Sequence, residues 1–368
     1  MTPRLLLLVA LALSVPAAAR SEAPAPGAEP ARPATALGPE VPRGAMARFL
    51  AACREGHYAR AAEYLNLRQL PQSLRAQRGA ELARELETDY GYRRMDTFMV
   101  AARERGAVGG GHRVEAPGWL DSAGVVTAAL GSTETTAQVQ PARFTTALID
   151  AATTRGATLR IGVVEEIAQR DGAARGVRVG SETIEADAVV LAMGPWTSRA
   201  ARGLRLPAVH GLKGYSVTLA GADVPAHALF VDYRTADGRA LEPEIFPRPD
   251  GETYVCGMAD PAPLPESAEG VEVNNASCEV LARAAGRVST ALAAARIIRR
   301  QACYRPVTDD GLPLIGRIPG VAGAYVATGH GPWGMLNAPA TGLALSELIA
   351  DGAASLVDLR PFDPARRR

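Results

Sequence analysis

The sequence predicts a mixed α/β protein that combines an incomplete Rossmann-like nucleotide-binding domain with a domain built on an antiparallel sheet, behind a small helical segment. Three observations support this fold class. Residues 188–192 are continuously apolar and run into Gly194, as in a strand covered on both faces. Residues 324–328 form a second apolar run, followed by a glycine-rich loop and a helical pattern. Between these runs, several segments alternate apolar and polar residues like antiparallel strands.

Composition narrows the class of protein. The chain has 368 residues, 47% of them hydrophobic, which is enough for two domains with separate cores. Its 40 Lys and Arg residues balance 39 Asp and Glu residues, so nothing in the charge favours nucleic acid or an anionic membrane as partner. The four cysteines are scattered without the spacing of a zinc site or a redox dithiol, and no metal site is predicted.

The first 88 residues differ in character from the rest. Residues 1–19 have the basic start, apolar run and small-residue cleavage site of a signal peptide, and residues 20–44 form a Pro- and Ala-rich linker. Residues 45–88 carry apolar side chains at helical spacing and predict three packed helices. Their helical patterning resembles the periplasmic leader of bacterial small-conductance mechanosensitive channels. No membrane span is predicted to follow this segment.

From residue 89 onward the pattern becomes that of an α/β domain. A helix is predicted to begin at Pro141 and a strand at Thr158. Residues 171–172 are Asp-Gly, which predicts a hairpin turn between strands at 163–168 and 174–179.

Residues 206–301 are predicted to form the second domain. Its strand candidates are LKGYSVTLAG, HALFVDYRT, LEPEIFPRP and ETYVCGMAD, with Asp-Gly turn signals at 237–238 and 250–251. Residues 278–298 are predicted to form one long helix.

The C-terminal loop GHGPWG, residues 329–334, carries the clearest chemical signal. A strand precedes it and a helix follows, which is an arrangement that binds nucleotides. Glycines let backbone N–H groups approach a ligand, and a helix N-terminus favours negative charge. Too few residues follow for a complete Rossmann unit, so we expect the loop to close a fold begun earlier in the chain.

Taken together, these segments resemble the D-amino acid oxidase family of FAD-dependent oxidoreductases, which includes glycine and sarcosine oxidases. The segments that carry the resemblance are TTAQVQPARFTTALIDAA with RIGVVEEI, then ADAVVLAMGPWT, then CYRPVTDDGLPLIG with ATGHGPWGMLNAPATG. The resemblance covers about residues 90–363. It implies that FAD is the cofactor, bound by residues 89–205 and 302–363, and that the flavin accepts hydride from the carbon bearing the amine of a small amino acid or amine.

The same resemblance implies roles for individual residues. Arg305 would bind a substrate carboxylate, with Tyr304 and Tyr215 as candidates for the pocket wall. Contacts to FAD would come from Val164, Ala192, Gly194, Trp196, Gly329, His330, Gly331, Trp333, Gly334 and Met335. Taken singly, each has a structural alternative: Arg305 as a surface ion-pair residue, the tryptophans as core aromatics, and His330 as a cap of its loop.

One element of the family pattern is missing from the sequence. The N-terminal strand, GxGxxG loop and helix that hold the FAD pyrophosphate are not found, and the glycines at 106–111 have the wrong spacing. We therefore expect the strand at 188–192 to lack its usual neighbour, and FAD to bind weakly or not at all.

Two function classes remain open. One is a truncated FAD-dependent oxidoreductase acting on the C–N bond of an amine or amino acid. The other is a non-catalytic exported interaction module that carries an oxidoreductase remnant. The signal peptide favours a periplasmic or secreted location, whereas the family resemblance favours the cytoplasm.

Overall fold

The computed structural model describes residues 93–368, apart from 134–135, 202, 249, 356 and 367–368. The predicted signal peptide, linker and leader helices lie outside the described residues. The chain divides into two units, and residues 94–136 and 149–368 belong to the larger one. Residues 137–148 belong to the other unit. The three larger sheets and the site below lie within the larger unit.

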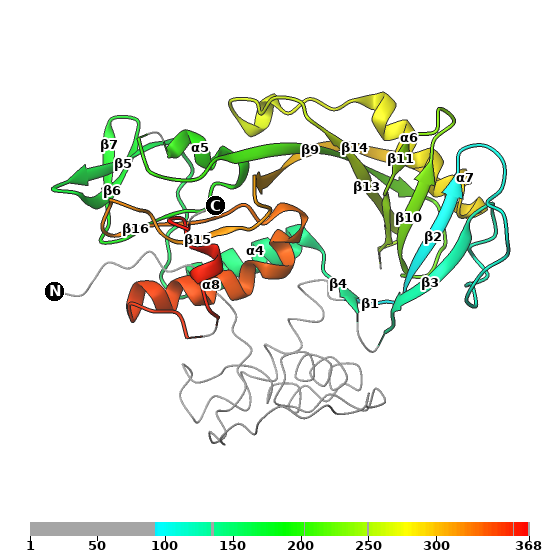
Figure 1. Cartoon of the computed structure of the whole chain (residues 1–368), viewed down its shortest axis with the longest axis horizontal. Helices are drawn as coiled ribbons and strands as arrows, with labels where there is room; N and C mark the ends of the chain where they lie inside the picture. The colour runs from blue at the N-terminus through cyan, green and yellow to red at the C-terminus, as the bar shows by residue number, and fades with distance from the viewer. Residues whose placement is uncertain (1–92, 134–135, 202, 249, 356, 367–368) are drawn as a thin grey trace, which may run out of the picture. The chain divides into compact units, whose positions relative to one another are not determined.

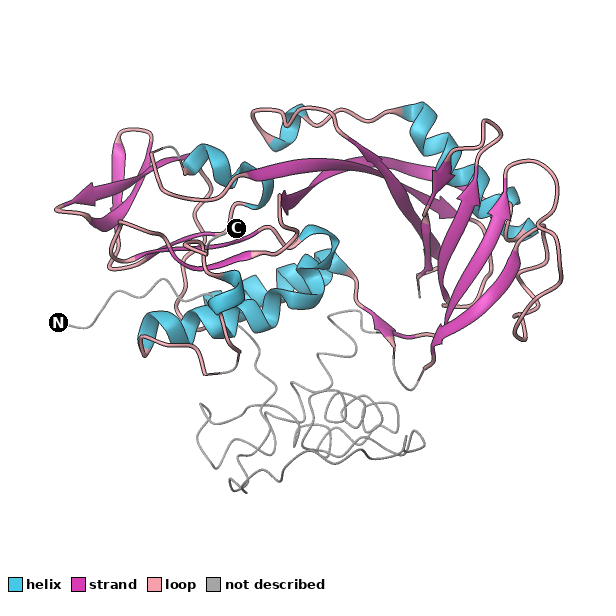
Figure 2. Ribbon diagram, viewed as in Figure 1, coloured by secondary structure: helices cyan, strands magenta, loops and turns pink. Residues whose placement is uncertain are grey.

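An eight-stranded sheet is the largest element, and its long strands β9 and β14 are conspicuous in Figure 2. The strand order is β14-β9-β13-β12-β10-β2-β3, with β11 paired to β10. Among the described strands of this sheet, β2 and β10 are parallel neighbours and the other neighbouring pairs are antiparallel. The strands are β2 (Thr97–Arg103), β3 (Val125–Gly131), β9 (Val209–Ala220), β10 (Ala228–Arg234), β11 (Ala240–Leu241), β12 (Glu244–Pro247), β13 (Glu252–Asp260) and β14 (Arg296–Thr308).

The antiparallel strands predicted between residues 212 and 260 are confirmed, but the sheet recruits further segments. β2 and β3 come from the stretch that the sequence assigned to the nucleotide-binding domain, and β2 pairs with β10 along its whole length. β14 likewise crosses the predicted boundary at residue 301. Pairing between strands more than a hundred residues apart leaves no local pattern, so sequence periodicity did not report it.

The single helix predicted over residues 278–298 is wrong. The structure has α6 (Asn275–Gly286), then α7 (Thr290–Ala294), and β14 already begins at Arg296. Gly286 ends α6, and a Cβ there would lie 3.0 Å from the Cα of Ala293. Glycine thus allows α7 to pack closely against the end of α6.

Helix α6 closes one face of the large sheet (Figure 1). The side chain of Asn274 caps the helix by accepting a hydrogen bond from Ser277 N at 3.2 Å. Cys278, Leu281 and Ala284 are fully buried, and they pack with sheet residues such as Val217 and Val255, among others. The strand residues that point the other way form what we call the open face of the sheet.

Two three-stranded sheets lie in the part of the chain predicted to bind the nucleotide. In the first, β16 (Ala324–Thr328) lies between β15 (Leu314–Arg317) and β8 (Val189–Leu191), parallel to β8 and antiparallel to β15. The second is formed by β5 (Val164–Arg170), β6 (Ala173–Val179) and β7 (Glu182–Glu185). Among the described strands β8 has β16 as its one neighbour. The missing first strand therefore stays a prediction.

The predicted hairpin after residue 163 is confirmed. Asp171 and Gly172 have φ angles of 53° and 72°, as a type I′ turn requires. The strand predicted from Thr158 begins only at Val164, however, and the side chains of Leu159 and Ile161 before it are exposed.

The remaining elements are short or helical. The helices are α4 (Pro141–Thr154), α5 (Thr197–Ala200) and α8 (Gly334–Ala350), and the predicted start of α4 at Pro141 is confirmed. The 3-10 turns are η3 (Gly194–Trp196), η4 (Ala268–Gly270), η5 (Gly331–Trp333) and η6 (Arg360–Phe362), and β1 (Arg93–Arg94) pairs with β4 (Ala137–Gln138). In the part of the chain described here, no helix is long and apolar enough to cross a membrane.

Asp310, in the turn after β14, anchors the C-terminal segment. Its carboxylate accepts hydrogen bonds from Arg366 Nε at 2.8 Å and Nη2 at 2.9 Å, and from Leu312 N at 3.1 Å. Mainly through its hydrogen bonds to Asp310, the Arg366 guanidinium holds the pKa of that carboxyl well below its usual range. A pKa that is depressed on folding stabilises the fold above the unfolded-state value of about 3.9, and this stabilisation is lost as the pH falls further.

We expect Asp310→Asn to remove this dependence on pH. The variant should be less stable than the wild type at neutral pH. Its melting temperature should also fall less steeply between about pH 5 and pH 3, because no charge is lost at this position. Thermal unfolding across that range measures both effects. Parallel curves for the two proteins would show that the Asp310–Arg366 pair does not contribute.

Candidate functional site

Two adjacent parallel strands, β8 and β16, are each followed by a Gly-Pro-Trp triplet. β8 leads into Gly194-Pro195-Trp196 and β16 into Gly331-Pro332-Trp333, and each triplet forms a 3-10 turn followed by a helix. The two glycines have φ angles of 52° and 56°, in the left-handed region. Apart from the adjacent residues, no atom of the described part of the chain lies within 4 Å of the position that a Cβ would take on either glycine. Open α/β sheets bind ligands at the carboxyl ends of their strands, which is where these turns lie.

Two threonines that the sequence analysis missed tie these turns together. The hydroxyls of Thr197 and Thr328 lie 2.7 and 3.0 Å from the carbonyl oxygen of Gly194, and 3.1 Å from each other. Both side chains are buried. The hydroxyl pair therefore fixes the end of β8 relative to the end of β16. Nucleotide-binding sequence motifs specify no threonine at these two positions, so the sequence did not predict this pair.

Gly329 allows the loop at residues 329–334 to pack against β14, the strand that carries Arg305. Its φ angle is 81°, and a Cβ would lie 2.9 Å from Thr308 Cγ2 and 3.4 Å from Pro313 Cα. Both the backbone conformation and the space therefore require glycine. Thr308 is three residues beyond Arg305 on β14. This separation places the backbone of Arg305 about 10 Å along the strand from the loop.

The remaining residues of the loop divide into a buried and an open part. His330 is held by a contact of 3.0 Å between its Nε2 and Thr341 Oγ1 on α8, and burial lowers its pKa, so its imidazole is neutral at neutral pH. Trp333 is 60% exposed and Leu336 is 73% exposed. Gly334 and Met335 are the first residues of α8, where backbone N–H groups lack partners within the helix. The loop and the first turn of α8 thus present apolar side chains and N–H donors side by side.

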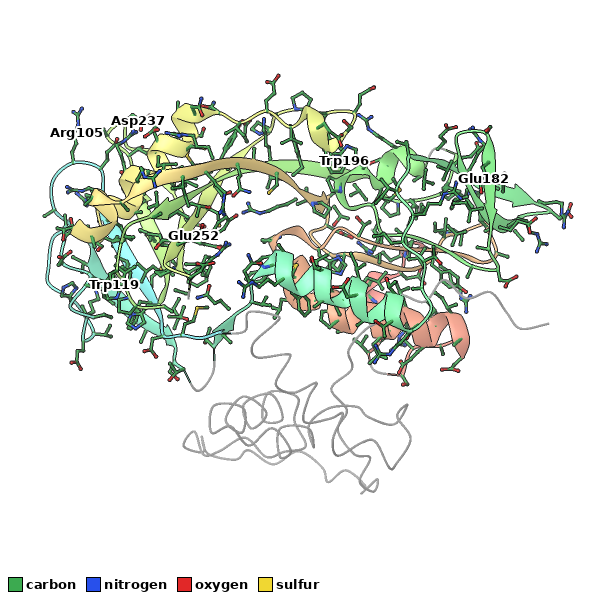
Figure 3. The ribbon with its side chains drawn as sticks, turned by 180° about the vertical axis from the view of Figure 1, so that it is seen from behind. Arg105, Trp119, Glu182, Trp196, Asp237 and Glu252 are labelled. Carbon is green, nitrogen blue, oxygen red and sulfur yellow. The ribbon has the colours of Figure 1, made fainter. Side chains whose placement is uncertain are left out.

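The other residues predicted to contact a cofactor lie at strand ends. Val164 is the first residue of β5, and Ala192, just after β8, is exposed. Trp196 donates a hydrogen bond from Nε1 to the carbonyl of Pro265 at 2.9 Å, which ties η3 to the segment after β13 (Figure 3). The hydrogen bond gives Trp196 a structural role at the edge where Gly194 lies.

Arg305 lies on the open face of the large sheet. In the ladder between β14 and β9, Arg305 pairs with Leu212 and Cys303 pairs with Gly214. The guanidinium folds back over Gly214, where a Cβ would lie 3.1 Å from Nη1 and 3.4 Å from Cζ. Gly214 thus makes room for the arginine to lie across β9. Within the described part of the chain, the side chain of Arg305 forms no hydrogen bond or ion pair.

Tyr304 and Tyr215 are not brought together with Arg305. Directly opposed residues of antiparallel strands share a face, and Tyr304 pairs with Lys213 while Tyr215 pairs with Ala302. Both rings therefore point to the face that α6 covers. Tyr304 donates to the carbonyl of Pro263 at 2.7 Å, and Tyr215 donates to Asp260. Burial, with the hydrogen bond to Asp260, raises the pKa of Tyr215 to about 12.

Between these tyrosines lies Lys213, the only lysine of the chain. Its side chain is 7% exposed, and Nζ lies 5.4 Å from the ring centroid of Tyr215 and 5.7 Å from that of Tyr304. Two aromatic faces stabilise the buried ammonium group by cation–π attraction. The predicted pocket wall is thus part of a packed cluster on the closed face.

Glu244 faces Arg305 on the open face, and sequence reasoning missed it. Cys256 Sγ donates to Glu244 Oε2 at 3.7 Å. Burial raises the pKa of Glu244, while the nearby Arg305 acts in the opposite direction. Burial also raises the pKa of Cys256 to about 12, which keeps its thiol protonated. A glutamate in an alternating strand is typical of a solvated position, so its burial had no sequence signal.

Two strand-turn-helix units next to an antiparallel sheet define the class of protein. It is a nucleotide-binding enzyme fold, in which the antiparallel sheet lies beside the strand ends that bind the ligand. The model of the family described as FAD dependent oxidoreductase matches residues 36–348. The chain belongs to this family, and FAD is the family's cofactor. The matched range includes residues 45–88, the predicted leader helices.

Individual relatives agree with this assignment. The chain is 32% identical over 276 residues to the putative oxidoreductase TDA3 of Saccharomyces cerevisiae, covering 64% of this chain and 52% of that protein. It is 35% identical over 223 residues to a D-amino acid dehydrogenase of Cereibacter sphaeroides, covering 59% of this chain and 47% of that protein. The chain thus spans about half the length of these curated relatives.

Solved structures share the fold. Glycine oxidase from Geobacillus kaustophilus superposes with a TM-score of 0.60 at 23% identity, covering 91% of this chain and 85% of that one. Iminodiacetate oxidase from Chelativorans sp. BNC1 gives a TM-score of 0.61 at 21% identity, covering 90% and 85%. The predicted mixed α/β fold is confirmed.

The residues at the strand ends fit the flavin side of FAD. Gly194 and Gly331 leave open the space that a Cβ would take. The exposed ring of Trp333 offers an apolar surface, and the first turn of α8 offers donors for negative charge. The N-terminal GxGxxG unit that would hold the pyrophosphate is not found in the sequence.

Proposed function

We propose that the chain oxidises the C–N bond of a small amino acid, with hydride transfer to FAD. The observation that carries the proposal is Arg305, a half-buried guanidinium without a partner among the described residues, on the open sheet face and about 10 Å along β14 from the loop contact at Thr308. A planar guanidinium binds a carboxylate through two parallel hydrogen bonds. Relatives named D-amino acid dehydrogenase and glycine oxidase support a substrate of this kind.

This arrangement gives the cofactor and the side chains separate roles in the reaction. FAD, when bound, supplies the hydride acceptor. Arg305 orients the substrate through its carboxylate, which fixes the carbon next to it, and Gly214 keeps the guanidinium flat against β9. The threonine pair at Gly194 and the packed Gly329 hold the two turns in register with β14.

Product analysis tests the proposed reaction. Protein loaded with FAD is incubated in air, with an artificial electron acceptor added to reoxidise the reduced flavin. The substrates are glycine, sarcosine, D-alanine and L-alanine, and methylamine and ethylamine, which lack the carboxylate. We expect ammonia or methylamine together with a 2-oxo acid from at least one amino acid, because the imine product hydrolyses in water. Turnover of the simple amines at the same rate would contradict a role for the carboxylate. FAD-loaded protein that turns over no amino acid would favour the non-catalytic module.

FAD occupancy provides a separate prediction. Because the N-terminal GxGxxG unit of the family is not found in the sequence, we expect protein purified without added FAD to contain much less than one flavin per chain. Added FAD should then restore absorbance at about 450 nm on the protein fraction. Gel filtration followed by absorbance spectroscopy measures the ratio. A full complement of flavin after purification would show that another part of the chain supplies the missing contact.

A further inference from the structure

Glu244 and Arg305 occupy one face of the large sheet, and neither the family pattern nor the loop motifs assign Glu244 a role. Glu244 pairs with Cys256 across β12 and β13, and Cys256 pairs with Ser216 on β9. Ser216 is two residues from Gly214, over which the guanidinium of Arg305 lies. Residues two apart on a strand share a face. The carboxylate and the guanidinium therefore both belong to the open face.

The charges of Glu244 and Arg305 influence each other, but the two side chains do not form an ion pair. Arg305 is close enough to influence the pKa of Glu244, yet no N–O distance between them is 4.0 Å or less. Among the described residues, the hydrogen-bond partner of the Glu244 carboxylate is the Cys256 thiol, at 3.7 Å. A thiol is a weak donor, so the carboxylate keeps most of its capacity to accept hydrogen bonds.

Aromatic residues lie next to Glu244 on the open face. Phe230 and Phe246 pack edge to face at 6.2 Å between ring centroids, and both strands place them beside Glu244. Tyr254 lies on the same face, and the guanidinium carbon of Arg248 lies 4.8 Å from the centroid of its ring. Removing an unpaired charge from water costs several kcal/mol even after relaxation. A partly desolvated anion held apart from a partly desolvated cation is suited to a ligand that carries both charges.

We propose that Glu244 binds the ammonium group of the substrate while Arg305 binds its carboxylate, so that the site selects zwitterionic amino acids over carboxylates that lack an amine. This inference rests on the proposed function, and it adds a residue that determines specificity. Two anchors would also fix the direction of the C–N bond, which one anchor leaves free to rotate.

A pair of inert ligands tests the inference without turnover. 2-Aminoisobutyrate is zwitterionic but has no hydrogen on the carbon bearing the amine, so it cannot give up hydride. 2-Hydroxyisobutyrate carries a hydroxyl instead of the ammonium group. Each is titrated by calorimetry into FAD-loaded wild-type protein and into the Glu244→Gln and Arg305→Met variants.

We expect the wild type to bind the amino compound at least about ten times more tightly than the hydroxy compound, the preference that one charge-assisted hydrogen bond provides. Glu244→Gln should abolish this preference, mainly by weakening binding of the amino compound. Glu244→Asp, which keeps the charge, should retain part of it. Glu252→Gln is the matched control, because Glu252 lies on the same face but pairs with Arg299 at 2.8 Å. It should bind as the wild type does.

The outcomes separate the two claims. An unchanged preference in Glu244→Gln, or equal weakening of both ligands, would overturn the role of Glu244. Unchanged binding of both ligands by Arg305→Met would instead overturn the proposed function. Thermal unfolding of each variant verifies that the sheet is intact.

Discussion

Arg305→Met is expected to lower kcat/KM for an amino acid substrate by about 100- to 1000-fold, which corresponds to about 3 to 4 kcal/mol. The side chain keeps much of its apolar stem but loses the guanidinium that we assign to the carboxylate. The loss should appear in both substrate binding and turnover, since the same contact orients the reacting carbon. Steady-state kinetics on FAD-loaded protein measures it.

Two further variants show whether the effect belongs to this site. Arg305→Lys should recover only part of the activity, because an ammonium group keeps the charge but not the bidentate geometry. Arg299→Met removes another arginine of β14, one that is exposed and paired with Glu252, and should stay within about threefold of the wild type. Equal losses in Arg299→Met and Arg305→Met would point to a general effect of positive charge on this strand.

Gly329→Val is expected to weaken FAD binding at least tenfold. Valine at a φ of 81° is strained by about 1 to 2 kcal/mol, and its Cβ would overlap Thr308 Cγ2 at 2.9 Å. The loop must therefore move away from β14. Since the helix end and the exposed Trp333 ring follow directly, this shift displaces the surface that we assign to the flavin. Titration with FAD, followed by absorbance or fluorescence, measures the affinity.

Gly320→Val is the matched control for this prediction. Gly320 lies in the turn before β16, with a φ of 82°. Among the described residues other than its chain neighbours, no atom lies within 4 Å of a Cβ there. It imposes the same backbone strain without the overlap, and it lies at the other end of the strand. We expect this variant to lose some stability yet bind FAD like the wild type. Equal loss of FAD in both variants would show that unfolding, and not the loop, is responsible.

The structural features that were predicted correctly from the sequence depend on local chemistry. The turn at residues 171–172 and the loop at 329–334 need glycine for positive φ angles, and this need is visible without knowing the neighbours. The buried strand at 188–192 followed from an apolar run that ends in glycine. The order of these elements then led to the family through resemblance.

The features that it missed depend on register. Alternation places Arg305 and Tyr304 on opposite faces, but it cannot say which face is covered; helix α6, some 20 residues before them in the chain, decides that. The burial of Lys213 depends on two tyrosines from different strands. Glu244 looks like a solvated residue until Cys256 and the phenylalanine pair are placed beside it.

The reductive half-reaction tests the proposed function most directly. FAD-loaded protein is mixed with an amino acid in the absence of oxygen, and the absorbance at about 450 nm is followed. We expect glycine, sarcosine or an alanine enantiomer to bleach the flavin, while methylamine and ethylamine leave it oxidised. A bound flavin that no amino acid bleaches, or that the simple amines bleach equally well, would contradict oxidation of a C–N bond guided by Arg305.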